Sequence, residues 1–191
     1  MMKQLSDLEL ITNIKSGDVL SFEELVNRHK KFAYKVAYNV LRIHEDAEEV
    51  AHDAFVKVYT IIKDFKGDSK FTTWFYRIVL NMAIGKTRKK KLVTEDIFDP
   101  NIRLGQQEFQ EASNDLQNIE RKKYIDGAMA NLNDEERALL GLYYFKELSL
   151  EEMTEITGLT TNTMKVKIFR ARKKMAKHLE NLLPNEVASI Y

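Results

Sequence analysis

The residues with the clearest capacity for chemistry lie in the stretch HEDAEEVAHDAF, residues 44–55, which holds five carboxylates, two histidines and no lysine or arginine. Histidine and carboxylate side chains bind zinc and other divalent metals, and they also act as general acids and bases. His44, Glu48 and His52 are spaced four residues apart, so a helix would bring them toward one side. Three alternatives follow: a metal site, an acid/base centre, or a surface that docks a partner.

Helical geometry argues against the metal site. His44 and His52 would lie about 12 Å apart along a helix axis, too far to share one ion without other ligands. Residues of a helix turn by about 100° each, which places Glu49, His52 and Asp53 opposite the apolar stripe that includes Val50. Catalytic carboxylates need burial or charged neighbours to adjust their pKa values, whereas these face outward. We therefore predict no metal, no cofactor and no enzyme activity, and a merely solvated face remains the alternative to docking.

The rest of the chain contains no catalytic signature. No glycine-rich phosphate loop, nucleophile elbow or zinc-protease motif occurs. The 191 residues include no cysteine, which excludes disulfides and thiolate chemistry and favours a reducing compartment. No stretch approaches the roughly 18 apolar residues that span a membrane. We expect a soluble, cytoplasmic protein without membrane insertion.

Charge is distributed unevenly along a chain whose formal net charge is only +1. Residues 85–91 read GKTRKKK, and residues 156–179 contain many lysines and arginines but no acid. Residues 92–119 carry six acids against one arginine. Two basic blocks separated by an acidic segment predict two contacts with a polyanion, joined by a connector that avoids it.

The elements that position these residues are predicted to be helices throughout. Glycine and proline are scarce, and apolar residues recur at intervals of three and four. Four serine or asparagine residues precede a glutamate by three positions, the spacing of a helix-capping box: Ser6, Ser21, Asn133 and Ser149. Periodicity fails after residue 91, where Pro100 and Gly105 occur. We predict an all-α protein with domains at 1–91 and 114–184, a flexible acidic linker at 92–113 and a tail at 185–191.

The C-terminal basic block matches a helix-turn-helix. A short helix is predicted at 150–157, then Gly158 at the turn, then a second helix from Thr160 or Thr161. Its basic outer face suits the major groove of DNA. A solvated amphipathic helix is the alternative, but such helices usually mix both charge signs. The predicted buried side comprises Met164, Ile168, Ala171, Met175 and Leu179.

An aromatic and basic block, residues 65–91, ends the first domain. Aromatic rings that stack on unpaired bases, with lysine and arginine on the backbone, are typical of single-stranded nucleic-acid binding. Trp74 and Phe75 lie at helical spacing, however, which favours a place in the core. The polar loop 66–70 is better placed for ligand contact.

Three motifs, EDAEEVAHDAFVKVY, FKGDSKFTTWFYRIVLN and TTNTMKVKIFRARKKM, occur in the order and at the distances found in bacterial RNA polymerase sigma factors of the extracytoplasmic function (ECF) group. The chain resembles this family over nearly its whole length. The resemblance implies that the first domain binds core polymerase and opens the minus-ten promoter element, capturing an unpaired base. It implies that the second binds the minus-thirty-five element as duplex.

The same resemblance implies roles for individual residues. The outward residues of 44–55 would dock on the clamp of the largest polymerase subunit, while the flap of the second largest subunit and an anti-sigma factor are further expected partners. His52 replaces the family's more usual glutamine. The implied clamp contacts are Glu49, His52 and Asp53. The implied minus-ten contacts are Phe65, Lys66, Gly67, Asp68, Ser69, Lys70 and Phe71 with Asn81 at the base pocket, and Arg77, Arg88, Lys89 and Lys90 at phosphates. The implied minus-thirty-five contacts are Lys165, Val166, Lys167, Phe169 and Arg170.

Two other functions are weighed against this one. A helix-turn-helix regulator that never joins polymerase would share the second domain, but it would not need the aromatic loop or the outward acids. A recombinase would need a catalytic serine or tyrosine beside clustered arginines. The arginines of the first domain, Arg28, Arg42, Arg77 and Arg88, are instead dispersed along the chain.

Overall fold

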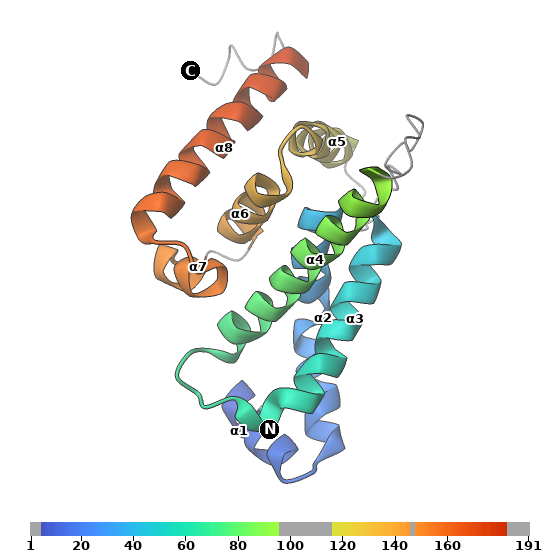
Figure 1. Cartoon of the computed structure of the whole chain (residues 1–191), viewed down its shortest axis with the longest axis vertical. Helices are drawn as coiled ribbons and strands as arrows, with labels where there is room; N and C mark the ends of the chain where they lie inside the picture. Colours follow the sequence, from blue (N-terminus) through green and yellow to red (C-terminus); the bar gives the residue numbers. More distant parts are fainter. Residues whose placement is uncertain (1–4, 96–115, 146–147, 183–191) are drawn as a thin grey trace.

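The computed structural model describes residues 5–95, 116–145 and 148–182, and the regular elements in these ranges are all helical. The predicted all-α class is confirmed. In chain order the elements are α1 (Asp7–Lys15), α2 (Val19–Leu41), α3 (His44–Ile61), the short 3-10 helix η1 (Ile62–Asp64), α4 (Phe71–Glu95), α5 (Leu116–Ala130), α6 (Asp134–Phe145), α7 (Leu150–Thr157) and α8 (Thr161–Leu182) (Figure 1).

The first domain is a bundle of α2, α3 and α4, with the short α1 packed against α2 and η1 at one end (Figure 1). The apolar stripe predicted for α3 is buried, since Val50 and Val58 are 4% and 0% exposed. Phe75 of α4 is fully buried, and its ring lies 4.5 Å from that of Phe55. Burial of one apolar stripe from each helix is what holds such a bundle together.

Three of the four predicted capping boxes form. The side-chain oxygens of Ser6 and Ser149 each accept a hydrogen bond from the backbone amide of the glutamate three residues later. The carboxylate of that glutamate accepts from the backbone amide of the serine in return. Asn133 and Glu136 make the same reciprocal pair at 2.8 and 2.9 Å. The prediction for Ser21 is wrong, because Asp18 caps α2 instead: its carboxylate accepts from the Leu20 amide and from the buried Ser21 hydroxyl.

The second domain contains the predicted helix-turn-helix. Gly158 follows α7 with a left-handed φ of 74°, a conformation in which glycine carries no β-carbon penalty. Thr160 then caps α8, its hydroxyl oxygen accepting from the Thr163 amide at 3.3 Å. On α8, the predicted inner residues Met164, Ile168 and Ala171 are buried.

The predicted domain limits lie close to helix ends. Helix α4 continues to Glu95, four residues beyond the predicted end of the first domain, and α5 begins at Leu116. Most of the predicted linker 92–113 and the whole of the predicted tail 185–191 fall outside the described residues. The division into two domains at these positions stays a prediction.

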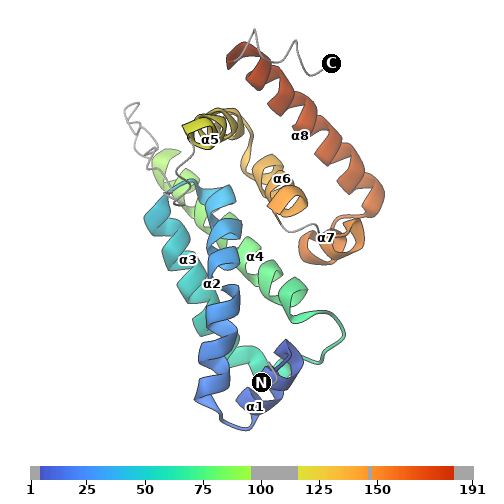
Figure 2. The same ribbon diagram turned by 180° about the vertical axis from the view of Figure 1, so that it is seen from behind.

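The two halves of the chain pack directly against each other. Helix α6 contacts α2, and α7 contacts α4, while α8 lies on the side of α6 and α7 away from α3 (Figures 1 and 2). The buried apolar residues of both halves form one continuous cluster. Within the described ranges, no helix combines the length and apolar character needed to cross a bilayer.

Candidate nucleic-acid and polymerase interfaces

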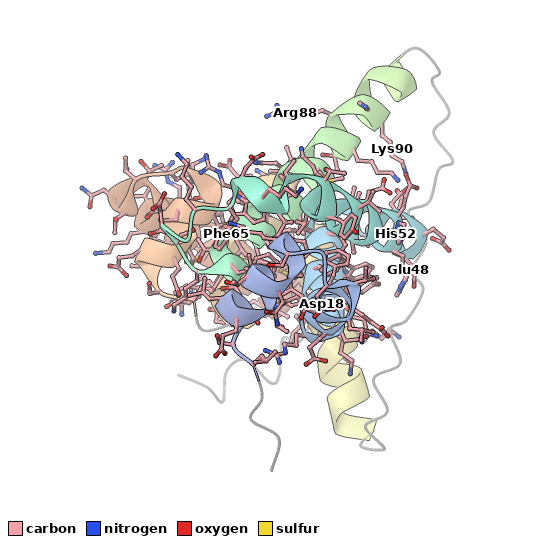
Figure 3. All side chains as sticks on the ribbon, turned by 90° about the horizontal axis from the view of Figure 1, so that it is seen from below. Asp18, Glu48, His52, Phe65, Arg88 and Lys90 are labelled. Atoms are coloured by element: carbon pink, nitrogen blue, oxygen red, sulfur yellow. The ribbon has the colours of Figure 1, made fainter. Side chains whose placement is uncertain are left out.

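The acidic segment forms an exposed face on α3. The side chains of Glu49, His52 and Asp53 are 62%, 78% and 54% exposed, so the outward orientation predicted from helical geometry is confirmed. Glu48 and His52 project from the outer edge of the bundle, on the side away from α7 and α8 (Figure 3). His52 Nδ1 lies 3.6 Å from a carboxylate oxygen of Asp53. This face is exposed and negatively charged, which suits docking against a basic surface of a partner protein.

A network of ion pairs joins this acidic face to α4, and the sequence did not indicate it. Lys86 Nζ lies 3.1 Å from Asp46 and 2.7 Å from Glu49, and Lys90 also pairs with Asp46. Burial alone would raise the pKa of Asp46, but hydrogen bonds from Lys90 and Lys86 outweigh it and hold that pKa below its ordinary value. Two residues predicted to meet partners, Glu49 and Lys90, thus also stabilise the packing of α3 on α4.

His44 has a local partner. Its Nδ1 lies 2.6 Å from the hydroxyl of Tyr34, and its ring lies 4.9 Å from that of Tyr38. Across residues 5–95, 116–145 and 148–182, no three His, Cys, Asp or Glu residues gather into a metal-binding group.

The segment predicted to contact minus-ten DNA, residues 65–71, leads from η1 into the first residue of α4, and we call it the minus-ten loop. Phe65 and Phe71 at its ends are 4% and 2% exposed, so their rings are buried rather than presented to solvent in this structure. Both rings instead pack in the aromatic cluster with Trp74, 5.1 and 6.1 Å from its ring. Lys15 of α1 donates to the Phe65 carbonyl at 2.6 Å, which fixes the start of the loop. The two phenylalanines therefore anchor the loop.

The middle of this loop is presented to solvent. Lys66, Gly67, Asp68 and Lys70 are exposed, and Ser69 is half-buried. Gly67 has a φ of 84°, a turn conformation that other residues adopt with difficulty. Phe75 is a core residue and Trp74 is half-buried beside Phe65, as the helical spacing suggested. The loop thus presents two cationic side chains, Lys66 and Lys70, between two buried anchoring residues.

The polar side of α4 continues from this loop along the first domain. Arg88 projects away from the bundle, whereas Lys90 points toward α3 (Figure 3). The exposed cations of α4 suit contact with a phosphate backbone. The exposed residues of α4 include five of those predicted to contact minus-ten DNA: Arg77, Asn81, Arg88, Lys89 and Lys90.

The outer face of α8 presents both charge and apolar surface. Lys165 and Arg170 are exposed, and Val166 and Phe169 are 47% and 68% exposed. Large apolar side chains this exposed on a basic helix suit contact with thymine methyl groups in the major groove. Lys167 differs from the other predicted contacts, because it is half-buried and its ammonium lies 2.7 Å from Glu135 of α6.

Comparison with known proteins identifies both halves. The family model described as Sigma-70 region 2 matches residues 25–93, and that described as Sigma-70, region 4 matches residues 122–175. The chain is 31% identical to the ECF RNA polymerase sigma factor SigW of Bacillus subtilis, over 90% of this chain and 96% of that protein. It is also 31% identical to the RNA polymerase sigma-H factor of Pseudomonas aeruginosa, over 96% and 98% of the two chains.

Solved structures share the fold. CnrH, solved in complex with the cytosolic domain of CnrY, superposes with a TM-score of 0.65 at 23% identity, over 92% of this chain and 97% of that one. The sigma factor RpoE of Bartonella quintana, solved with the anti-sigma factor NepR, gives a TM-score of 0.67 at 22% identity, over 85% and 98%. The matches span both basic blocks and the acidic face of α3, and the chain therefore belongs to the ECF group of the sigma-70 family, the factors that join core RNA polymerase to start transcription at promoters.

Proposed function

We propose that this sigma factor divides its work among three separate surfaces. The acidic outer face of α3 would dock on the clamp of the largest polymerase subunit. The lysine and arginine side chains of α4 and of α8 would contact DNA. The observation that supports this division is the segregation of charge. Glu49, His52 and Asp53 are exposed on α3. His52 projects on the side away from α7 and α8 (Figure 3), and α8 carries the exposed Lys165 and Arg170. Such segregation prevents the polymerase-docking face from repelling DNA.

The first domain is proposed to open the minus-ten element. The exposed loop residues Lys66 to Lys70 would surround an unpaired base, with Asn81 supplying an amide for its hydrogen-bonding edge. Arg77, Arg88 and Lys89 would then hold the phosphates of the same strand. The buried rings of Phe65 and Phe71 would keep the loop in shape during this contact.

The second domain is proposed to read the minus-thirty-five element as duplex. Helix α8 would enter the major groove with its first turns, as recognition helices do. Arg170 can donate two hydrogen bonds to a guanine edge, and Phe169 and Val166 can contact thymine methyl groups. Lys165 and Lys167 would add phosphate or base contacts, Lys167 after leaving Glu135.

Further partners follow from the same assignment. The second domain would also meet the flap of the second largest polymerase subunit, and an anti-sigma factor would control access to the protein. The chain would act in the cytoplasm, where bacterial core polymerase and promoter DNA are found. It would hold no catalytic group of its own, since the acids of α3 are exposed rather than arranged around a substrate.

Reconstituted transcription tests this function. Purified protein is mixed with bacterial core polymerase and fragmented genomic DNA, and the run-off transcripts are sequenced. We expect transcripts whose start sites share a pair of upstream elements and which are absent with core polymerase alone. A matched sample carrying Glu49→Lys and Asp53→Lys should contain markedly fewer of these transcripts.

The helix-turn-helix regulator remains the competing function. It would be favoured if the protein bound duplex DNA sequence-specifically but neither co-purified with core polymerase nor produced new transcripts.

A further inference from the structure

Helix α1 is anchored to the first domain near both of its ends. Near its start, the Asp7 carboxylate lies 2.8 Å from Nε2 of the buried His29 and 3.4 Å from the guanidinium of Arg28, both on α2. Near its end, the side-chain amide of Asn13 donates to the Ser21 hydroxyl at 3.2 Å. The apolar residues of α1 between and beside these contacts are buried: Leu10, Ile11 and Ile14. The last turn of α1 therefore has a defined position on the bundle.

Lys15 connects this last turn to the minus-ten loop. The residue is exposed, yet its ammonium donates to the Phe65 carbonyl at 2.6 Å, across a sequence separation of 50 residues. Hydrogen bonds with a charged donor are stronger than those between neutral groups. Helix α1 also contacts η1, which leads into the loop (Figure 1). The Sigma-70 region 2 match begins only at residue 25, so this contact comes from outside the matched segment.

The contact fixes the direction in which the loop leaves the core. The Phe65 carbonyl belongs to the planar peptide unit that joins Phe65 to Lys66, so a donor held at this oxygen restricts rotation of that unit. The Phe65 amide in turn donates to the Ile62 carbonyl at 3.2 Å, and the Phe65 ring is buried. With amide, ring and carbonyl all held, Lys66 starts from a defined position and orientation.

The far end of the loop is held by α4 itself. The Lys70 carbonyl accepts from the Trp74 amide at 3.2 Å, and Phe71 is buried. Residues 66–68 between these ends are exposed, so the positions of the ends determine the path of the segment that is proposed to surround a base. The start of the loop is the end at which α1 acts.

We propose that Lys15 is a positioning residue for capture of the unpaired minus-ten base. It holds the minus-ten loop in the conformation that receives the base, so less ordering is needed when the strand binds. Capture of the base rests on the proposed function, whereas the effect of Lys15 on the shape of the loop does not. Loss of the Lys15 ammonium should weaken binding of single-stranded minus-ten DNA and reduce selection among bases, while duplex binding by the second domain stays the same.

Three substitutions separate positioning from charge. Lys15→Met removes the donor and keeps a flexible side chain, whereas Lys15→Arg keeps both the charge and a donor. Lys63→Met is the matched control, because Lys63 on η1 is exposed and carries the same charge close to the start of the loop. Helical content by circular dichroism and affinity for core polymerase should match the unsubstituted protein in all three.

Trp74 reports the shape of the loop without any DNA. It is the single tryptophan of the chain, and its ring lies 5.1 Å from that of Phe65. When Phe65 loses its tie to α1, the half-buried Trp74 ring should become more accessible. We expect acrylamide to quench Trp74 fluorescence more strongly in Lys15→Met than in Lys63→Met, Lys15→Arg or the unsubstituted protein. Equal quenching in Lys15→Met and Lys63→Met would overturn the positioning role.

Base capture is measured with holoenzyme formed from core polymerase and each full-length variant. The probe is a fork-junction DNA made from a promoter found by the run-off sequencing above, duplex over the upstream element and single-stranded over the minus-ten element. Each single-stranded position carries the four bases in turn. We expect Lys15→Met to bind the best fork at least about fivefold more weakly than Lys63→Met, with lower discrimination at the captured base. Lys15→Arg should restore both properties, and a duplex carrying the upstream element alone should bind all variants equally.

The remaining outcomes separate positioning from the proposed function. Uniform weakening of all forks by Lys15→Met, with the slope of log affinity against log salt concentration reduced by about 1, would make Lys15 a phosphate contact and overturn its positioning role. Equal fork binding by Lys15→Met and Lys63→Met would overturn it with the proposed function intact. If the unsubstituted holoenzyme did not discriminate among single-stranded bases, the proposed function of the loop would be overturned and the role of Lys15 in capture with it, whatever the quenching of Trp74.

Discussion

Individual basic residues differ in the ion pairs that they must lose before they can bind DNA. Lys167 and Lys90 already pair with carboxylates of neighbouring helices, so a phosphate must displace an existing partner. Arg170 is exposed on the outer face of α8, and its planar guanidinium can donate hydrogen bonds to both acceptors of a guanine edge. The ion pairs of Lys167 and Lys90 could not be predicted from the sequence, because pairs between helices depend on packing that residue spacing does not reveal.

Arg170→Ala should weaken binding of the second domain at one base pair of the upstream element. Loss of a bidentate contact reduces discrimination by about 1–3 kcal/mol at that position. Binding of the full chain with core polymerase to a panel of single-base promoter variants measures this effect. The control is Lys173→Ala, since Lys173 is also exposed on α8. It should weaken binding to all sequences alike and reduce the slope of log affinity against log salt concentration by about 1. Equal weakening across the panel by Arg170→Ala would make it a phosphate contact.

Asp46→Asn should destabilise the first domain in a pH-dependent way. The lysine hydrogen bonds that lower the Asp46 pKa stabilise the fold above the ordinary aspartate pKa of about 4, and this stabilisation is lost as pH falls through the lowered value. At pH 7 the substitution should reduce the free energy of unfolding by about 1–3 kcal/mol. Urea unfolding at a series of pH values measures it.

The difference between Asp46→Asn and the unsubstituted protein should shrink below about pH 4. Asp68→Asn, in the exposed loop, is the control and should change stability little at any pH. A constant difference from pH 7 to pH 3 would show that lost packing, rather than charge, causes the destabilisation.

Helix ends were the most predictable elements. Capping depends on side chains within three residues, so Ser6, Asn133 and Ser149 could be identified without tertiary information. The prediction for Ser21 failed because Asp18, three residues earlier, is an equally good cap residue and begins the helix first. Ser21 then lies inside the first turn and donates to the Asp18 carboxylate. The turn at Gly158 was also predictable, because its backbone angle favours glycine.

The minus-ten loop was less predictable. Phe65 and Phe71 flank a polar segment, and this pattern fits rings that stack on a base as well as rings that anchor a loop. Only the packing of α4 on α3 and the tie from Lys15 to the Phe65 carbonyl decide for anchoring. Residues that contact a ligand and residues that support them can share one sequence pattern.

The outer face of α3 should fail as a docking surface when its charge is reversed. Glu49→Lys with Asp53→Lys places two positive charges on a surface proposed to meet polymerase, so binding of core polymerase should weaken at least about tenfold, or about 1.4 kcal/mol. Competition binding against a labelled sigma factor measures it, with helical content followed by circular dichroism.

Two controls isolate this surface. Glu23→Lys with Asp64→Lys changes net charge equally at exposed sites of the same domain and should leave binding unchanged. His52→Gln, which introduces the family's more usual residue, should bind at least as well as the unsubstituted protein. Full binding by the α3 double variant, with its helices intact, would remove the clamp assignment.

At the scale of the whole molecule, the sequence predicted two domains but not how they pack. A linker that avoids nucleic acid is compatible with domains apart or together. Gly141 in the middle of an apolar helix was the available signal, because a glycine lowers helix stability there and can mark a close approach of another element. The helix that approaches Gly141 could be identified only from the structure, in which the Asn39 side chain of α2 lies next to it.

Continuous packing across the two domains has a consequence for unfolding. The buried apolar residues of both halves form one cluster, and units that share a core unfold together. Calorimetry should therefore show one transition for the unsubstituted protein. Gly141→Ala should separate it into two transitions, since an added β-carbon forces α6 away from Asn39, whereas Gly85→Ala should keep one. Two transitions already present in the unsubstituted protein would mean that each domain folds independently and that the shared cluster contributes little to stability.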